Sequence, residues 1–258
     1  MTSQATLDAA RRLYEDGRAA EAMLAVAPLV RAVPPDPEAL HLFALALHAL
    51  GRHADALAAA GRLVAMVPAD PVVLTNAGAI AAAAGDMAAA EGFYRRAIAA
   101  NPLHVDAYSN LSVVLERMQR LHEAEMLLEK AIMLAPGSVA AHANLGNVLA
   151  RLARAPEAVG AYEQALELAP DNPEILNNLG NALRACDRLA DASAAFDRAI
   201  ALRPDYAEAH YNRGLVLAGQ NATEDAAAAM DRAIALKADP RFRLARAGLM
   251  PIVAPSET

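Results

Sequence analysis

Six prolines recur at intervals of 34 residues along the 258-residue chain, and no other feature constrains its fold as strongly. Proline cannot continue a helix, so each one predicts a turn at the same point of a repeating unit. Counted so that this proline is position 32, the units span residues 3–36, 37–70, 71–104, 105–138, 139–172, 173–206 and 207–240. The six prolines are Pro34, Pro68, Pro102, Pro136, Pro170 and Pro204.

Small residues recur at positions 8, 20 and 27 of the unit and indicate two closely packed antiparallel helices, with bulky residues at positions 11 and 24 filling the space beside them. Hydrophobic residues make up 56% of the chain but aromatic residues only 4%, so most of the apolar content is alanine and leucine, which favour helices. We therefore expect an all-α protein built from seven helical hairpins. Position 20 is alanine throughout: Ala22, Ala56, Ala90, Ala124, Ala158, Ala192 and Ala226.

These positions resemble the tetratricopeptide repeat (TPR) family over residues 3–240. The resemblance implies a right-handed TPR superhelix, an α-solenoid of seven 34-residue helix-turn-helix repeats. The first unit departs most from the family pattern, as the terminal cap of a solenoid does. In the fifth unit, Asn144, Leu145, Gly146 and Asn147 are followed by Ala158, Tyr162, Ala165 and Pro170.

The chain after the repeats predicts a C-terminal capping helix. Residues 239–247 have helical character, and Phe242, Ala245 and Leu249 are available to cover the last hairpin. Gly248 and Pro251 should end this helix. Residues 241–258 are thus expected to form the capping helix and a linker or tail.

Charge and composition exclude several classes of protein. A formal net charge of −7 and a pI near 5.5 disfavour nucleic-acid and membrane-surface binding, which need clustered basic residues. The sequence predicts a cytoplasmic protein, because neither a signal peptide nor an apolar run of roughly 20 residues is present. Cys186 is the only cysteine, so no disulfide or cysteine-based metal site can form within one chain.

Catalytic and metal-binding motifs are missing from the sequence. We find no phosphate-binding loop, dinucleotide-binding glycine pattern, nucleophile elbow or zincin histidine pair. His41 and His48 lie seven residues apart on one helical face, but two histidines without a third ligand make a poor metal site. His142 and His210 occupy position 4, where we expect interface residues. The sequence predicts a binding protein without a cofactor or metal rather than an enzyme.

Asparagines recur at positions that, by the family resemblance, face the concave groove. Position 6 is asparagine in five consecutive units, although asparagine is unfavourable inside helices. An amide has a donor and an acceptor and can bind the backbone of an extended partner, but it can equally bond across helices, and the sequence leaves both open. The candidate peptide-binding residues are Asn76, Asn110, Asn144, Asn147, Asn178, Asn181, Asn212, Arg117, Arg151 and Arg184.

The segments 106–111 and 141–147 are similar to repeats of O-linked N-acetylglucosamine transferase and SPINDLY-like proteins, whose superhelix presents an asparagine ladder to protein substrates. Residues 242–253 are similar to the junction where bacterial relatives enter the glycosyltransferase domain. The resemblance implies a substrate-recognition region, with flagellin or another surface protein as a substrate. A glycosyltransferase domain would then lie C-terminal to this chain.

Three other functions compete with this interpretation. A free-standing scaffold or adaptor without any link to glycosylation is the first alternative. A chaperone adaptor of the carboxylate-clamp kind is disfavoured, because its lysine positions hold Ser109, Ala143 and Asn177. An enzyme in its own right is disfavoured by the missing motifs. In every favoured case the expected partner is a protein or peptide.

Overall fold

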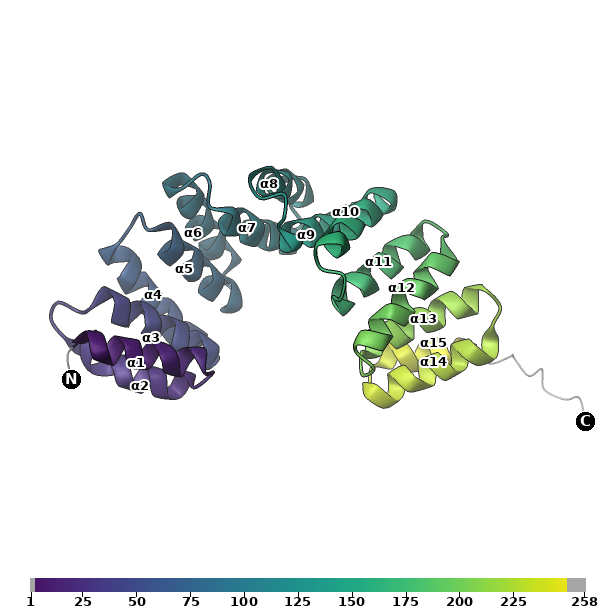
Figure 1. Ribbon diagram of the computed structural model, residues 1–258, viewed down its shortest axis with the longest axis horizontal. Helices are drawn as coiled ribbons and strands as arrows, with labels where there is room; N and C mark the ends of the chain where they lie inside the picture. Colours follow the sequence, from purple (N-terminus) through teal and green to yellow (C-terminus); the bar gives the residue numbers. More distant parts are fainter. Residues whose placement is uncertain (1–2, 250–258) are drawn as a thin grey trace, which may run out of the picture. The chain divides into compact units, whose positions relative to one another are not determined.

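The computed structural model describes residues 3–249, and this part of the chain contains fifteen α-helices and no strand (Figure 1). The predicted all-α class is therefore confirmed. The helices are α1 (Ser3–Glu15), α2 (Ala19–Arg31), α3 (Pro37–Ala49), α4 (His53–Met66), α5 (Pro71–Ala83), α6 (Met87–Ala100), α7 (Val105–Arg117), α8 (Leu121–Leu134), α9 (Val139–Arg151), α10 (Ala155–Leu168), α11 (Pro173–Ala185), α12 (Leu189–Leu202), α13 (Ala207–Gly219), α14 (Thr223–Leu236) and α15 (Pro240–Gly248).

Several first helices of the hairpins begin with a capping residue followed by proline. In α5, Asp70 accepts hydrogen bonds from the backbone N–H groups of Val72 and Val73 at 2.9 and 3.0 Å, and Pro71 occupies the first turn. Proline is favourable there because its missing N–H would have no helical partner. The same arrangement of cap and proline starts α3, α11 and α15. These local signals set where the first helices begin.

The repeat prolines lie just beyond the second helices, as their spacing predicts. Helices α4, α6, α8, α10 and α12 each end two residues before a repeat proline. The carbonyl group of that proline then accepts a side-chain hydrogen bond. His142 Nε2 lies 2.9 Å from the Pro136 oxygen and Arg198 Nη2 lies 3.2 Å from the Pro170 oxygen. The carbonyl oxygens of these two prolines are thus satisfied within the repeat array.

The chain divides into two compact units, the first ending at Ala135 and the second beginning at Pro136. In the first unit, helix α3 contacts α1 and α5, and α5 also contacts α7. In the second unit, α11 contacts α9 and α13. Each unit has a surface formed by the first helices of its hairpins, which we call its first-helix face. In the first unit this face consists of α1, α3, α5 and α7. In the second unit it consists of α9, α11 and α13.

Small buried residues hold the two helices of each hairpin close together. The seven position-20 alanines are all 0% exposed. A methyl group added at Gly146 would lie 2.5 Å from Cε1 of Tyr162, and one at Gly78 would lie 2.6 Å from Cε1 of Tyr94. Such contacts leave no space for a side chain, so glycine lets the aromatic ring pack directly on the neighbouring helix backbone.

Helix α15 covers the end of the last hairpin, which confirms the predicted capping helix. Phe242 is 0% exposed, and its ring stacks on that of Tyr211 with the centroids 4.6 Å apart. Ala207 and Ile234 belong to the same apolar cluster. The helix ends at Gly248, as expected, while Pro251 lies outside the described residues. The bounds of the repeats themselves stay a prediction.

Candidate peptide-binding surface

The first-helix face of the first unit carries two of the predicted asparagines in different surroundings. Asn76 on α5 is half-buried, and its Nδ2 atom lies 2.8 Å from Nε2 of His41 on α3. Burial lowers the pKa of His41, and Asp70 and Glu38 only partly oppose this. The neutral ring can therefore accept the amide hydrogen of Asn76. Asn110 on α7 has no side-chain hydrogen-bond partner within residues 3–249.

Asn110 and Arg117 line one pocket of about 270 Å³ in the first unit. The two residues lie seven apart on α7, on the same helical face. Tyr94 of α6 and His48 of α3 also line the pocket, together with small aliphatic side chains of α5 and α7. Burial raises the pKa of Tyr94 to about 12, so its hydroxyl group stays protonated. The pocket thus combines apolar walls with groups that donate hydrogen bonds.

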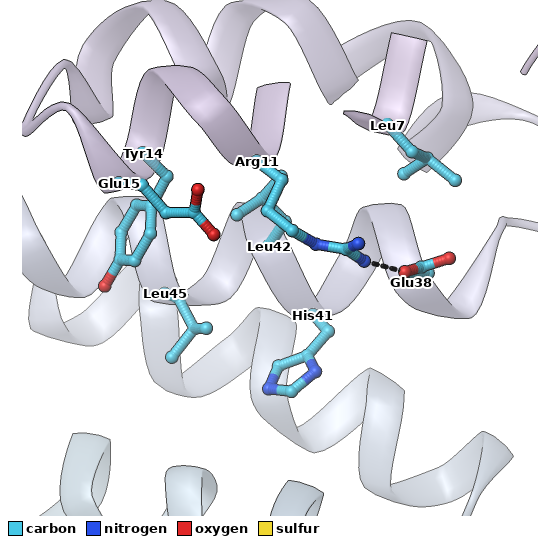
Figure 2. Close-up of a pocket in the computed structure, with 8 residues that line it drawn as sticks. All are labelled: Leu7, Arg11, Tyr14, Glu15, Glu38, His41, Leu42 and Leu45. Carbon is cyan, nitrogen blue, oxygen red and sulfur yellow. Dashed lines mark hydrogen bonds and ion pairs between the residues drawn. The ribbon is translucent and has the colours of Figure 1, made fainter. Parts of the chain in front are cut away.

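A second pocket, of about 350 Å³, lies between α1 and α3 (Figure 2). An ion pair between Arg11 and Glu38 connects the two helices at its edge. Leu42, Leu45 and Tyr14 supply apolar surface. Since Arg11 is already paired and Glu15 also lines it, this pocket lacks the unpaired positive charge that Arg117 gives to the one beside Asn110.

Four asparagines of the second unit form a chain of hydrogen bonds across three first helices. Asn147 Oδ1 on α9 accepts from Asn178 Nδ2 on α11 at 3.1 Å. Asn178 Oδ1 accepts from Asn177 Nδ2 at 3.4 Å, and Asn177 Oδ1 accepts from Asn212 Nδ2 on α13 at 2.9 Å. The hydroxyl group of Tyr162 also donates to Asn147 Oδ1, at 2.7 Å. These amides therefore bond across helices, which is one of the two roles that the sequence left open.

The other two predicted asparagines of the second unit lie outside this chain. Asn144 on α9 and Asn181 on α11 are half-buried, and their side chains have no hydrogen-bond partner within residues 3–249. Asn147 uses its oxygen twice, but none of the bonds found in this region uses its Nδ2 group. The second unit thus presents amides with some of their hydrogen bonds made beside amides with none made within residues 3–249.

The three predicted arginines lie in the last turns of their first helices. Arg117, Arg151 and Arg184 are exposed and occupy the last turns of α7, α9 and α11. A positive charge there interacts favourably with the carbonyl end of the helix dipole. This placement gives each arginine a structural role while leaving its guanidinium group at the surface.

The position-4 histidines lie where one hairpin meets the next. Nε2 of His142 and of His210 lies 2.9 and 3.0 Å from the carbonyl oxygens of Pro136 and Pro204. Because a carbonyl oxygen only accepts, both rings must carry a proton on Nε2. No group of three or more histidine, cysteine, aspartate or glutamate residues within residues 3–249 has the arrangement of a metal site. None of the helices in that range is both long and apolar enough to cross a bilayer.

Sequence reasoning gives Tyr94 a packing role only, and it places His48 and Asn177 among the polar groove residues without counting them as peptide-binding residues. Tyr94 occupies position 24, which reads as a packing position, and only its hydroxyl group signalled a polar role. Asn177 is 6% exposed and links two neighbouring amides. Its signal was the pair of adjacent asparagines at 177 and 178.

Family models described as tetratricopeptide or TPR repeats match residues 41–105, 103–171, 161–192 and 180–221. A search of curated proteins finds no match.

Solved structures share the fold at low sequence identity. A tetratricopeptide repeat protein of Parabacteroides merdae has a TM-score of 0.74 at 15% identity, with 96% of this chain and 98% of that chain covered. PilF of Pseudomonas aeruginosa gives a TM-score of 0.71 at 17% identity, covering 82% and 97% of the two chains. YrrB, described as a TPR protein with an unusual peptide-binding site, gives 0.60 at 23% identity, covering 73% and 97%.

Proposed function

Because the chain is a tetratricopeptide repeat protein, we propose that it is a binding module whose first-helix faces hold an extended segment of another protein. One observation carries this proposal. Asn110, Asn144 and Asn181 stand inside first helices, where asparagine is unfavourable, and their side chains have no hydrogen-bond partner within residues 3–249. An internal structural role therefore does not account for these three amides.

The chemistry of the amide fits a peptide backbone. Each side chain offers a donor and an acceptor, which match the carbonyl and N–H groups of an extended chain whatever side chains it carries. Neighbouring packed helices lie about 8–10 Å apart, and an extended peptide advances about 3.3–3.6 Å per residue. Within one unit, amides on successive first helices would then contact the partner about once every three residues. The peptide-binding site ascribed to YrrB agrees with this use of the fold.

The test is binding to an array of random peptides of about 15 residues, each long enough to reach roughly 50 Å when extended. The triple variant Asn110→Ala, Asn144→Ala and Asn181→Ala should weaken the tightest peptides by about tenfold or more, because each lost hydrogen bond contributes roughly 0.5–1.5 kcal/mol. Gln164→Ala on α10 removes an exposed amide from a second helix and serves as the control. Equal binding by the triple variant, with its helix content unchanged, would refute the proposal.

A narrower proposal concerns the partner: a protein substrate of a glycosyltransferase of the O-linked N-acetylglucosamine transferase or SPINDLY kind, such as flagellin or another surface protein. It rests on the similarity of the asparagine-bearing repeats, and the catalytic domain would lie outside this chain. Purified flagellin should bind the parent chain and lose affinity for the triple variant. A gene that does not continue into a glycosyltransferase, together with no flagellin binding, would leave a free-standing scaffold as the function.

A further inference from the structure

The pocket beside Asn110 has the size of a site for one side chain. Its volume is about 270 Å³, below the roughly 300–1,000 Å³ typical of sites for whole small molecules. Ala79, Ala82 and Ala83 of α5 and Val113 and Val114 of α7 supply its apolar walls. These walls could pack against the methylene groups of a side chain entering from the first-helix face.

The pocket exists because Tyr94 lacks the hydrogen-bond partner that its equivalent has in the second unit. In the second unit, the hydroxyl group of Tyr162 donates to Asn147 at 2.7 Å. Tyr94 occupies the same repeat position in the first unit, but the residue equivalent to Asn147 is Ala79. An alanine methyl can neither fill the space nor accept the hydrogen bond. Tyr94 is accordingly left without a hydrogen-bond partner in the part of the chain that the structure describes.

The free polar groups of the pocket are mainly donors. Arg117 has no ion-pair partner within residues 3–249, and no acidic side chain is among the residues that line the pocket. Asn110 adds an unpaired amide N–H group, and Tyr94 adds its hydroxyl group. A planar carboxylate accepts several hydrogen bonds at once and pairs well with a guanidinium group. A positive charge with unused donors above an apolar cleft is complementary to an acidic side chain.

We propose that this pocket selects a glutamate side chain of the bound segment, with the carboxylate on Arg117, Asn110 and Tyr94 and the methylene groups against the alanines of α5. Glutamate fits better than aspartate because its extra methylene group reaches past the apolar wall. The inference rests on the proposed function, since the acidic residue belongs to the extended segment held by the first-helix face. Binding to the backbone alone tolerates many sequences. The pocket would add a preference for segments that carry a glutamate.

The first experiment resynthesises the tightest array peptide with an amidated C-terminus and with each glutamate changed in turn to glutamine. One such change should weaken binding by about tenfold or more. Arg117→Gln should weaken binding of the parent peptide by a similar factor. Binding of the glutamine peptide should stay nearly unchanged, because this coupling is expected of two groups in contact. Arg232→Gln, an exposed arginine on the second helix α14, is the charge-matched control and should change neither.

A second variant tests the same pocket by filling it. Ala79→Asn recreates the partner that Tyr162 has in Asn147, so it should occupy the pocket and bond the Tyr94 hydroxyl. Selection between the glutamate and glutamine peptides should then disappear while the chain stays folded. Preserved selection in this variant would place the acidic residue somewhere else and overturn the inference.

The outcomes separate this inference from the proposed function. Equal affinity of all glutamate and glutamine peptides, with binding still dependent on the asparagines, overturns the acidic pocket alone. Binding that needs only a free C-terminal carboxylate also overturns it. An array without any binder refutes the proposed function. In that case the pocket is tested directly with N-acetylglutamate methylamide, and its glutamine analogue is the control. The readout is the NMR signal of the Arg117 Nε–H group. If both compounds shift this signal equally, the inference is overturned.

Discussion

A methyl group placed on Gly180 would lie 2.6 Å from Cε1 of Phe196, so the aromatic ring of α12 packs directly on the backbone of α11. The same relationship joins Gly146 to Tyr162 one repeat earlier. Phe196 is 0% exposed and belongs to the core of the second unit, which limits how far its ring can move. Glycine and ring thus act as a pair that sets the distance between the helices of a hairpin.

Gly180→Ala should therefore lower the free energy of unfolding by about 1–3 kcal/mol, the range typical of overpacking in a well-filled core. Gly160→Ala is the matched control, since a methyl group there would meet no atom within 4 Å. It should stabilise by about 0.5–1 kcal/mol through helix propensity alone. Urea denaturation of both variants measures the difference. Two variants of equal stability would show that Phe196 moves aside freely.

The turn inside each hairpin predicts a stabilising substitution at Ala153. Its φ angle is +59°, in the left-handed region where Gly17, Gly51 and Gly85 stand in the first three turns. A side chain in this conformation costs about 1–2 kcal/mol, which Ala153→Gly would remove. Glycine also gives the unfolded chain more conformational entropy, so the net gain in stability should be about 1 kcal/mol. Ala150→Gly, at an exposed site inside α9, should instead destabilise by a similar amount. A lower melting temperature for Ala153→Gly would contradict the assigned strain.

The asparagines should differ in what they contribute to folding. Asn178→Ala removes bonds to Asn147 and to Asn177, which is 6% exposed, and should destabilise by about 1–2 kcal/mol. Asn144→Ala removes no bond found within residues 3–249, so the higher helix propensity of alanine should leave stability equal or slightly raised. Thermal melts of the two single variants make the comparison. Equal losses would mean that the amide chain of the second unit adds nothing to folding.

The capping helix should contribute through one side chain. Phe242 is fully buried against Tyr211, and its replacement by alanine should cost about 3–5 kcal/mol. Leu244, on the same helix, is 77% exposed and gives a matched control whose replacement by alanine should change stability by less than about 0.5 kcal/mol. Calorimetry of both variants decides the matter. A Phe242→Ala chain that melts like the parent would show that α15 is not needed as a cap.

Two histidines should make the first unit sensitive to mild acid. Burial lowers the pKa of His41 and of His48, and His53 lowers that of His48 further. With a folded pKa below the unfolded value of 6.5, each ring takes up its proton more readily in the unfolded chain. The contribution of the two neutral rings to stability is therefore fully present above about pH 6.5, and it is lost as the pH falls toward their lowered pKa values in the folded chain. Urea midpoints at about pH 7.5 and 5.5 should differ less for His41→Gln combined with His48→Gln than for the parent.

The sequence by itself determined the helical hairpins, because their signals are local and repeated. Capping residues such as Asp70, prolines after the second helices and small residues at position 20 each act within one repeat. The spacing of these signals predicted the hairpin pattern, while the alanine- and leucine-rich composition favoured the all-α class and residues 239–247 predicted the capping helix. The same spacing placed the asparagines on the first helices, where the structure also has them.

Only the tertiary structure decided which of those asparagines are already bonded. Asn178 and Asn144 occupy the same repeat position, yet one bonds to Asn147 and Asn177 while the other has no partner within residues 3–249. Likewise, the pocket at Tyr94 depends on an alanine at position 79 in place of an asparagine. A hydrogen bond across hairpins needs two side chains within about 3 Å in compatible rotamers, and that distance is fixed by packing between repeats rather than by the period of any one of them.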